Sequence, residues 1–344
     1  MRKLTPDELR ACARGCVQTR EAAGALQFLR FGDAALKYYA QRDGWEVRSR
    51  CPAGVRLDFF TDADFVRVRA DVLPGARKCG YFDLYAGGVF TGTLGAADAP
   101  ERLEGELPCG PAGVRERRRV ELWLPHARPT VLHEVALPDG ASFEPAPVRG
   151  AEMLFLGDSI TQGMDATHPS FGYAMRVSKW LGQRHYNYGI GGAVFAADSL
   201  PEPPVEYVNN IVIAYGTNDW SGGLPCDLAQ RYLERVRSLW PQAVLSVLEP
   251  LWRTQADGPE GKPNKAGQTL AQYRAELRQV VADFDNAHCI PWEDLLPPCA
   301  EFLVDGVHPG DVGHMIYANN LIASATPWLI FTDELTVDEI DLEK

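Results

Sequence analysis

The stretch MLFLGDSITQG, residues 153–163, decides the fold of the C-terminal half of this chain. Its first four residues form a short, wholly apolar run, which is typical of a strand buried on both faces of a parallel sheet. Similar runs occur at 211–215 and 244–248. We expect helices at about 171–182, 227–240, 265–285 and 312–325. Strands that alternate with helices predict an α/β domain, with a parallel sheet covered by helices on both faces.

The first half of the chain has a different pattern. Between about 55 and 137, apolar and polar residues alternate in short runs such as 65–72 and 120–124, separated by glycine and proline. A period of two predicts antiparallel sheets with one solvent-facing side, packed as a β-sandwich. The turn-rich stretch 138–147 is the expected linker. We therefore predict a β-sandwich accessory domain over 1–149, an α/β catalytic domain over 150–330 and a tail over 331–344.

Composition narrows the classes of function. The 344 residues carry a net charge of −12, and charges of this sign repel phosphate backbones and anionic lipid. We therefore expect no nucleic-acid or membrane partner, and we interpret the one basic cluster, 114–119, as a solvated face. No run of 18 apolar residues and no secretory signal is seen, so we expect a cytoplasmic protein with reduced thiols. The sequence leaves the oligomeric state open.

Polar segments follow the apolar strands at the places where an α/β sheet presents its functional edge. They read GDSITQG at 157–163, NYGIGG at 187–192, GTND at 216–219 and DGVHP at 305–309. None contains the lysine of a phosphate-binding loop or the spacing of a dinucleotide-binding turn. We expect no metal and no organic cofactor.

These four segments resemble the signature blocks of the SGNH (GDSL) hydrolases. They occur in the order of that family, and the resemblance covers about 150–328. It implies a three-layer α/β/α domain and an esterase with Ser159 as nucleophile. It also implies that Asp158 is structural, and we treat Asp219 likewise.

The chemistry of the site can also be argued from the residues. A serine hydroxyl needs a base to take its proton as it attacks, and histidine suits neutral pH. Among seven histidines, His308 lies in one of the four blocks, and Asp305, three residues earlier, can fold back to its Nδ1. We expect Asp305→Asn to cost on the order of 10²-fold in activity, depending on whether another acceptor can hold the ring. His314 is the alternative base.

Acyl transfer also needs donors for the oxyanion of the tetrahedral intermediate. We expect the backbone N–H groups of Ser159 and Gly192 and the side-chain amide of Asn218 to supply them. Gly189 or Gly191 could replace Gly192 if the register of the loop differs.

The order of a β-sandwich followed by an SGNH domain resembles certain carbohydrate esterases and a branch that includes acyltransferases. The leading hypothesis is therefore an esterase acting on short-chain, mainly acetyl, esters of small molecules or carbohydrates. An acyltransferase with an alcohol acceptor is the alternative, and a binding module with an inactive site is the third. Trp220, Trp252 and Arg253 follow sheet strands and are candidates for substrate contact, since a sugar can stack on an indole ring. A core or rim role is the competing interpretation of these aromatic residues.

Overall fold

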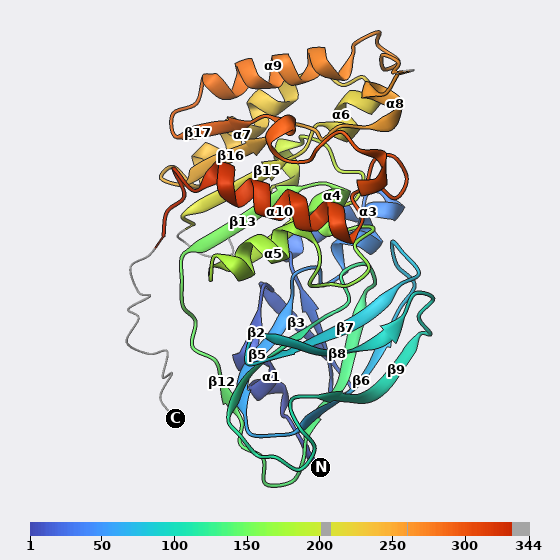
Figure 1. Ribbon diagram of the computed structural model, residues 1–344, viewed down its shortest axis with the longest axis vertical. Helices are drawn as coiled ribbons and strands as arrows, with labels where there is room; N and C mark the ends of the chain where they lie inside the picture. The colour runs from blue at the N-terminus through green and yellow to red at the C-terminus, as the bar shows by residue number, and fades with distance from the viewer. Residues whose placement is uncertain (201–207, 260, 332–344) are drawn as a thin grey trace.

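The computed structural model describes residues 1–200, 208–259 and 261–331. An N-terminal half of antiparallel strands lies against a C-terminal half in which helices cover a parallel sheet (Figure 1). The fold is therefore the predicted α/β domain preceded by an antiparallel sandwich.

The sandwich consists of two six-stranded antiparallel sheets. One has the order β3-β4-β11-β6-β9 with β1 added to β11, and the other has the order β12-β5-β10-β7-β8 with β2 added to β5. Buried and partly exposed residues alternate along β6, as the period of two predicts. The strands are β1 (Arg2–Lys3), β2 (Ala13–Arg14), β3 (Gln18–Ala22), β4 (Ala25–Leu29), β5 (Arg56–Thr61), β6 (Phe65–Val72), β7 (Gly80–Ala86), β8 (Val89–Ala96), β9 (Arg102–Pro108), β10 (Arg118–Trp123), β11 (Thr130–Leu137) and β12 (Glu144–Pro145).

The C-terminal half is built on a five-stranded parallel sheet of order β14-β13-β15-β16-β17. Each of its central strands is buried on both faces, which explains their apolar runs. The elements are β13 (Glu152–Gly157), α4 (Ser159–Gln162), α5 (Tyr173–Trp180), β14 (Arg184–Gly189), η1 (Ala197–Ser199), β15 (Asn210–Ala214), α6 (Thr217–Gly222), α7 (Asp227–Leu239), β16 (Val244–Leu248), α8 (Thr254–Asp257), α9 (Leu270–Ala282), β17 (Ala287–Ile290), η2 (Trp292–Asp294), η3 (Ala300–Phe302) and α10 (Asp311–Ala325).

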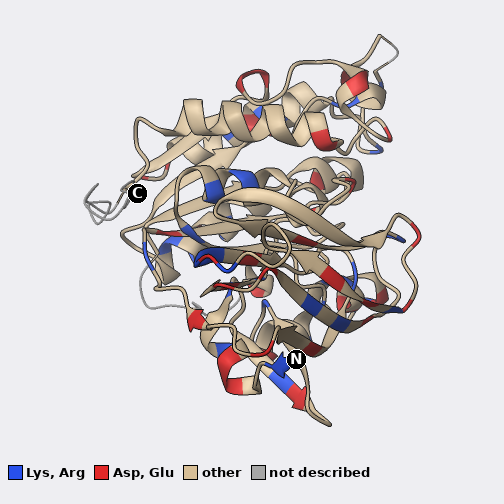
Figure 2. Cartoon of the chain, turned by 60° about the horizontal axis from the view of Figure 1, so that its bottom comes forward, with Lys and Arg blue, Asp and Glu red and all other residues tan. Residues whose placement is uncertain are grey.

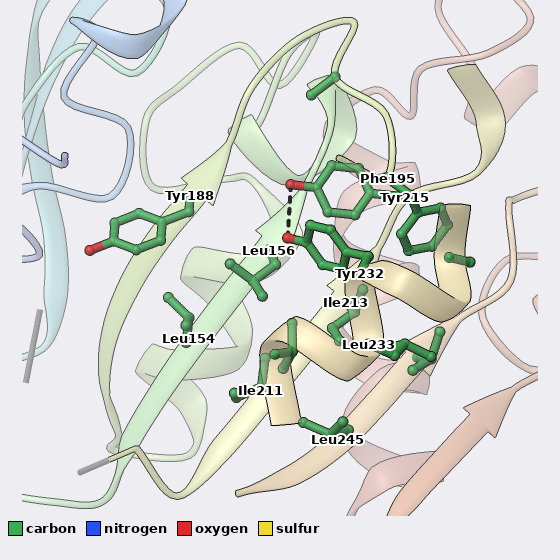
Figure 3. Close-up of a cluster of buried hydrophobic side chains, with 14 of the residues drawn as sticks. Leu154, Leu156, Tyr188, Phe195, Ile211, Ile213, Tyr215, Tyr232, Leu233 and Leu245 are labelled. Atoms are coloured by element: carbon green, nitrogen blue, oxygen red, sulfur yellow. Dashed lines mark hydrogen bonds between the residues drawn. The ribbon is translucent and has the colours of Figure 1, made fainter. Parts of the chain in front are cut away.

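Helices cover both faces of this sheet. Helices α5 and α10 pack against Met153 and Phe155 on one face, and α7 and α9 cover Leu154 and Leu156 on the other. Figure 3 shows the second core, where the hydroxyl of Tyr232 donates to that of Tyr215 at 3.4 Å. The longest described helix, α10, has 15 residues, and none is long and apolar enough to cross a membrane.

The N-terminal half also contains helices α1 (Pro6–Cys12), α2 (Asp33–Tyr39) and α3 (Asp43–Ser49). Helices α2 and α3 were not anticipated, and they pack Tyr39 and Trp45 into the core that α7 and α9 cover. The fully buried Arg30 joins the halves, since its guanidinium donates to the carbonyls of Asn187 and Gly189 in β14 and to those of Arg48 and Cys51. The expected accessory domain is therefore more than a sandwich.

The stretch 138–147 is not wholly the turn-rich linker that we expected. Within the stretch 138–147, β12 pairs with β5, so this segment is partly a strand. The basic cluster 114–119 lies among acids, with Arg117 beside Glu144 and Arg119 beside Asp58. Figure 2 shows acidic and basic residues next to one another on several strands of the chain. All eight cysteines are free thiols. The expected tail, apart from its first residue, lies outside the described residues.

Candidate active site

Ser159 stands at the start of α4, two residues after the end of the interior strand β13. Asp158 caps this helix, since its Oδ1 accepts the backbone N–H of Ile160 at 3.0 Å. The turn needs a glycine before it, because a Cβ on Gly157 would lie 2.0 Å from Oγ1 of Thr161. The serine is consequently held at the carboxyl edge of the sheet, with 6% of its surface exposed.

His308 lies between this serine and a carboxylate. Its Nε2 is 2.7 Å from Oγ of Ser159, and its Nδ1 is 2.8 Å from Oδ2 of Asp305. The other oxygen of Asp305 accepts the backbone N–H groups of Val307 at 3.0 Å and His308 at 2.9 Å. Partial burial favours the neutral acid, but these hydrogen bonds outweigh it and lower the pKa of Asp305. The structure thus brings together the three residues that the sequence singled out for proton transfer.

The alternatives to these residues have other partners. His314 is buried, and its Nδ1 accepts the backbone N–H of Tyr173 at 3.2 Å. Burial lowers the pKa of His314 to about 4. Asp305 does not cap the following helix, because the N-cap of α10 is Gly310.

A second carboxylate faces His308, and sequence reasoning did not identify it. Oδ2 of Asp165 lies 3.4 Å from Nδ1 of His308. Both oxygens of Asp165 accept from Arg77, which belongs to the loop between β6 and β7 of the sandwich. No sequence signal links residues 77 and 165, because the fold alone brings them together.

The loop after β14 provides one expected oxyanion donor. The backbone N–H of Gly189 is bonded to Oδ1 of Asn187 at 2.8 Å, and that of Gly191 to Oε1 of Gln162 at 2.9 Å. Among the hydrogen bonds of the described residues, none uses the N–H of Ser159 or Gly192. Gly192 also has a positive φ of 78°, which favours glycine. This pattern favours Gly192 over its two neighbours as the donor.

Asn218, in α6, is the expected side-chain donor. Its Nδ2 donates to the carbonyl of Ala193 at 3.0 Å and approaches Oδ2 of Asp158 at 3.4 Å. The first contact fixes the amide beside the loop that carries Gly192. Asp219 also anchors that loop, because it accepts the backbone N–H of Phe195 at 2.9 Å. It accepts in addition the backbone N–H of Gly216, at the start of α6, at 3.2 Å.

The environment of the two other acids agrees with a structural role. Burial raises the pKa of Asp158 to about 6 and that of Asp219 to about 7. Their oxygens accept backbone N–H groups of the loops that surround Ser159, and neither pairs with His308 by a hydrogen bond. Both acids therefore shape the site.

Removal of the Asn218 amide should slow the chemical step. We expect Asn218→Ala to lower kcat by about 10²-fold with little change in KM, because an oxyanion donor acts mainly in the transition state. Steady-state kinetics with p-nitrophenyl acetate measure this. Asn320→Ala, which removes a similar amide-to-carbonyl bond on α10, is the matched control. A rise in KM with kcat unchanged would show that Asn218 serves binding instead.

The candidates for substrate contact take different places. Trp220 is 6% exposed, lies in the core beneath α7 and α9, and donates its indole N–H to the carbonyl of Gln268 at 2.9 Å. This burial favours packing over a stacked sugar. Trp252 is half-buried against the core that contains α10. The guanidinium carbon of Arg253 lies 5.3 Å from the centre of the Trp220 ring. Arg253 also donates hydrogen bonds to Thr217 and Ser221, so it stabilises α6.

Helix α3 contributes residues to the site that the sequence analysis did not consider. Arg48 donates to the carbonyl of Gly191 at 2.8 Å. A Cβ on Gly192 would lie 3.4 Å from Nη1 of Arg48 and 3.5 Å from Nε1 of Trp45. Helix α3 of the N-terminal half therefore lies beside Gly192, the expected oxyanion donor.

Solved structures share this whole architecture. The salicylyl-acyltransferase SsfX3 from a tetracycline biosynthetic pathway has a TM-score of 0.79 at 22% identity, over 95% of this chain and 97% of that one. A family two carbohydrate esterase from Clostridium thermocellum, solved with cellohexaose, has a TM-score of 0.59 at 14% identity, over 80% and 94%. The acetyl xylan esterase Est2A from Butyrivibrio proteoclasticus has a TM-score of 0.56 at 14% identity, over 80% and 90%. At these identities the likeness concerns the fold.

Among curated proteins, none matches the sequence. The model of the GDSL-like lipase/acylhydrolase family matches residues 155–316, a range that runs from β13 into α10 and contains Ser159, Asn218 and His308. The matched range and the sandwich before it agree with the resemblance seen in the sequence. The α/β domain of the chain is thus similar to the GDSL-like lipase/acylhydrolase family over residues 155–316, and this similarity supports a serine hydrolase.

Proposed function

We propose that this chain is an esterase that hydrolyses short-chain acyl esters, chiefly acetyl esters, of small molecules or carbohydrates. The observation that carries the proposal is the line of hydrogen bonds from Asp305 through His308 to Ser159. The expected oxyanion donors are the backbone N–H groups of Ser159 and Gly192 and the amide of Asn218, which donates to Ala193 next to Gly192. A nucleophile, a base and oxyanion donors at one sheet edge suit acyl transfer.

The reaction then follows from the positions of these groups. Oγ of Ser159 attacks the ester carbonyl, and its proton passes to Nε2 of His308. The oxyanion accepts hydrogen bonds from the three donors. The intermediate collapses to an acyl-enzyme, and the leaving alcohol takes the proton from Nε2. A water molecule repeats the sequence, releasing the acid and restoring the serine.

The preference for a short acyl group is argued from the groups beside the expected oxyanion donor. Open pockets of about 550 Å³ near Arg77 and Arg128 and about 510 Å³ near Cys226 and Gln272 are lined by neither Ser159 nor His308. The guanidinium of Arg48 and the indole N–H of Trp45 lie beside Gly192. A cation and an N–H donor at this position suit a short acyl group better than a long apolar one.

We expect kcat/KM for p-nitrophenyl acetate to exceed that for the octanoate by at least about tenfold, since the Arg48 cation beside Gly192 disfavours the extra methylenes. A series of p-nitrophenyl esters of two to eight carbons measures the preference. The opposite order, with octanoate turned over faster, would show a long acyl pocket.

An acyltransferase is the second candidate, and the similarity to the salicylyl-acyltransferase over both halves of the chain favours it. Both reactions pass through the same acyl-enzyme, and the second acceptor distinguishes them. Incubating the enzyme with p-nitrophenyl acetate, with and without an alcohol or a sugar, and weighing the products by mass spectrometry separates them. Free acetate as the main product in the presence of acceptor supports the esterase, and a new ester supports the transferase.

A further inference from the structure

Nδ1 of His308 faces two carboxylates. It is hydrogen-bonded to Oδ2 of Asp305 at 2.8 Å, and Oδ2 of Asp165 lies at an ion-pair distance of 3.4 Å. The Asp305 side chain is 49% exposed, whereas that of Asp165 is only 15% exposed. The more distant carboxylate is therefore the better shielded from water.

Asp165 is held by the sandwich. Nε of Arg77 donates to its Oδ1 at 2.8 Å, and Nη2 donates to its Oδ2 at 2.7 Å, a two-pronged geometry that fixes the carboxylate plane. The hydrogen bond to Asp165 raises the pKa of Arg77. The backbone of Asp165 has a positive φ of 68°, an unusual conformation for a residue with a side chain. The fold thus places this side chain in one position.

We propose that Asp165 is a positioning residue for His308, a second carboxylate that can accept the Nδ1 proton in place of Asp305, and that Arg77 of the sandwich holds Asp165 for this task. The inference rests on the proposed function, since it takes His308 as the base for Ser159. It gives the sandwich a part in the reaction, because one of its loops orients the base.

The balance of charges around the ring agrees with this role. Asp165 and Asp305 face Nδ1, the buried Asp158 lies beyond Ser159, and Arg77 and Arg253 face these acids. When Nε2 takes the proton of Ser159, the ring becomes a cation. Arg77 offsets the charge of Asp165, so the Nδ1 side presents about one net negative charge to that cation.

A metal ion is another occupant that acids and a histidine could hold. Among the described residues, Asp165, Asp305 and His308 offer ligand atoms within 4.8 Å of one another. However, both oxygens of Asp165 already accept from a guanidinium, whose charge competes with a cation for the same place. The geometry therefore favours Asp165 as a partner of the His308 ring over Asp165 as a metal ligand.

A double-mutant cycle on the two acids tests the proposal. Asn tolerates the left-handed backbone of residue 165, so Asp165→Asn changes the charge and keeps the fold. With a second acceptor in place, Asp305→Asn should cost about tenfold in kcat, less than expected for a sole acceptor. The kcat of the double variant should be at least about tenfold lower than the kcat expected if the two single effects simply multiplied, with KM unchanged.

The second arm of the test concerns Arg77. In the Asp305→Asn background, Arg77→Ala should lower kcat further by about tenfold, and Arg77→Lys should restore part of it. The matched control is Tyr85→Phe in the same background, which removes the hydrogen bond from Tyr85 to Ser170 across the same interface and should leave kcat unchanged. Thermal melts of all variants report folding.

The outcomes separate this inference from the proposed function. Full activity in Ser159→Ala overturns the function itself. If Ser159→Ala is inactive and the losses at Asp165 and Asp305 simply multiply, the proposed function stands and the role of Asp165 as a second acceptor is overturned. Loss of activity in EDTA that a divalent metal restores would also overturn it in favour of a metal site. Synergy between the acids, with rescue by lysine at position 77, supports it.

Discussion

Replacing Ser159 with alanine is expected to lower ester hydrolysis by 10³-fold or more, because the acyl-enzyme cannot form without Oγ. The loss should appear in kcat, since the donors that bind the carbonyl oxygen remain. Oγ lies 2.7 Å from Nε2 of His308, so the folded enzyme already has the nucleophile in contact with its base. Release of p-nitrophenol from the acetate ester measures the effect.

A fluorophosphonate probe gives an independent reading of the same residue. It should label the wild type at Ser159, as peptide mass spectrometry can show, and should not label Ser159→Ala. Ser238→Ala is the matched control, because Ser238 is exposed on α7 and bonds only within that helix. Labelling at another serine, or full activity in Ser159→Ala, would show that the nucleophile lies elsewhere.

His308→Ala is expected to approach the same loss, about 10³-fold, because Ser159 then has no base to take its proton. The two residues act as a unit, so Ser159→Ala combined with His308→Ala should be no worse than either change alone. A double variant that falls by the product of the single losses would show that the residues act independently.

Imidazole rescue and a control histidine test the role of His308 as the base. Added imidazole should restore part of the activity of His308→Ala and none of Ser159→Ala, since it replaces the base and not the nucleophile. His133→Ala is the matched control, because His133 pairs with Asp71 at 2.7 Å in the sandwich, and it should keep full activity. Equal losses at positions 133 and 308 would mean that the effect is structural.

The parts of the site that could be predicted from sequence are local in the chain. Asp305 and His308 are three residues apart, so one turn brings the carboxylate to Nδ1. Ser159 follows an apolar strand directly, and the position of a residue after a parallel strand places it at the sheet edge. The apolar runs also predicted β13, β15 and β16, because strands buried on both faces have no polar positions to obscure them.

The contacts between distant segments could not be predicted. Arg77 and Asp165 are 88 residues apart and meet only because the sandwich docks beside α4. Helices α2 and α3 were missed because they interrupt the strand pattern of the first half and pack their apolar side chains into the other half. Trp220 follows a strand as a substrate contact would, but its ring lies under Arg253 within the core. Proximity in sequence says nothing about which way a side chain turns.

Arg30 has a consequence for the order of events during synthesis of the chain. Its guanidinium needs the carbonyl of Asn187, which the ribosome adds 157 residues later, roughly 10–30 s at ordinary elongation rates. Until then Arg30 has only the carbonyls of Arg48 and Cys51 as partners, and the apolar side chains of α2 and α3 lack the surface that covers them. The region around Arg30, α2 and α3 therefore cannot complete its packing until the second half of the chain has been made.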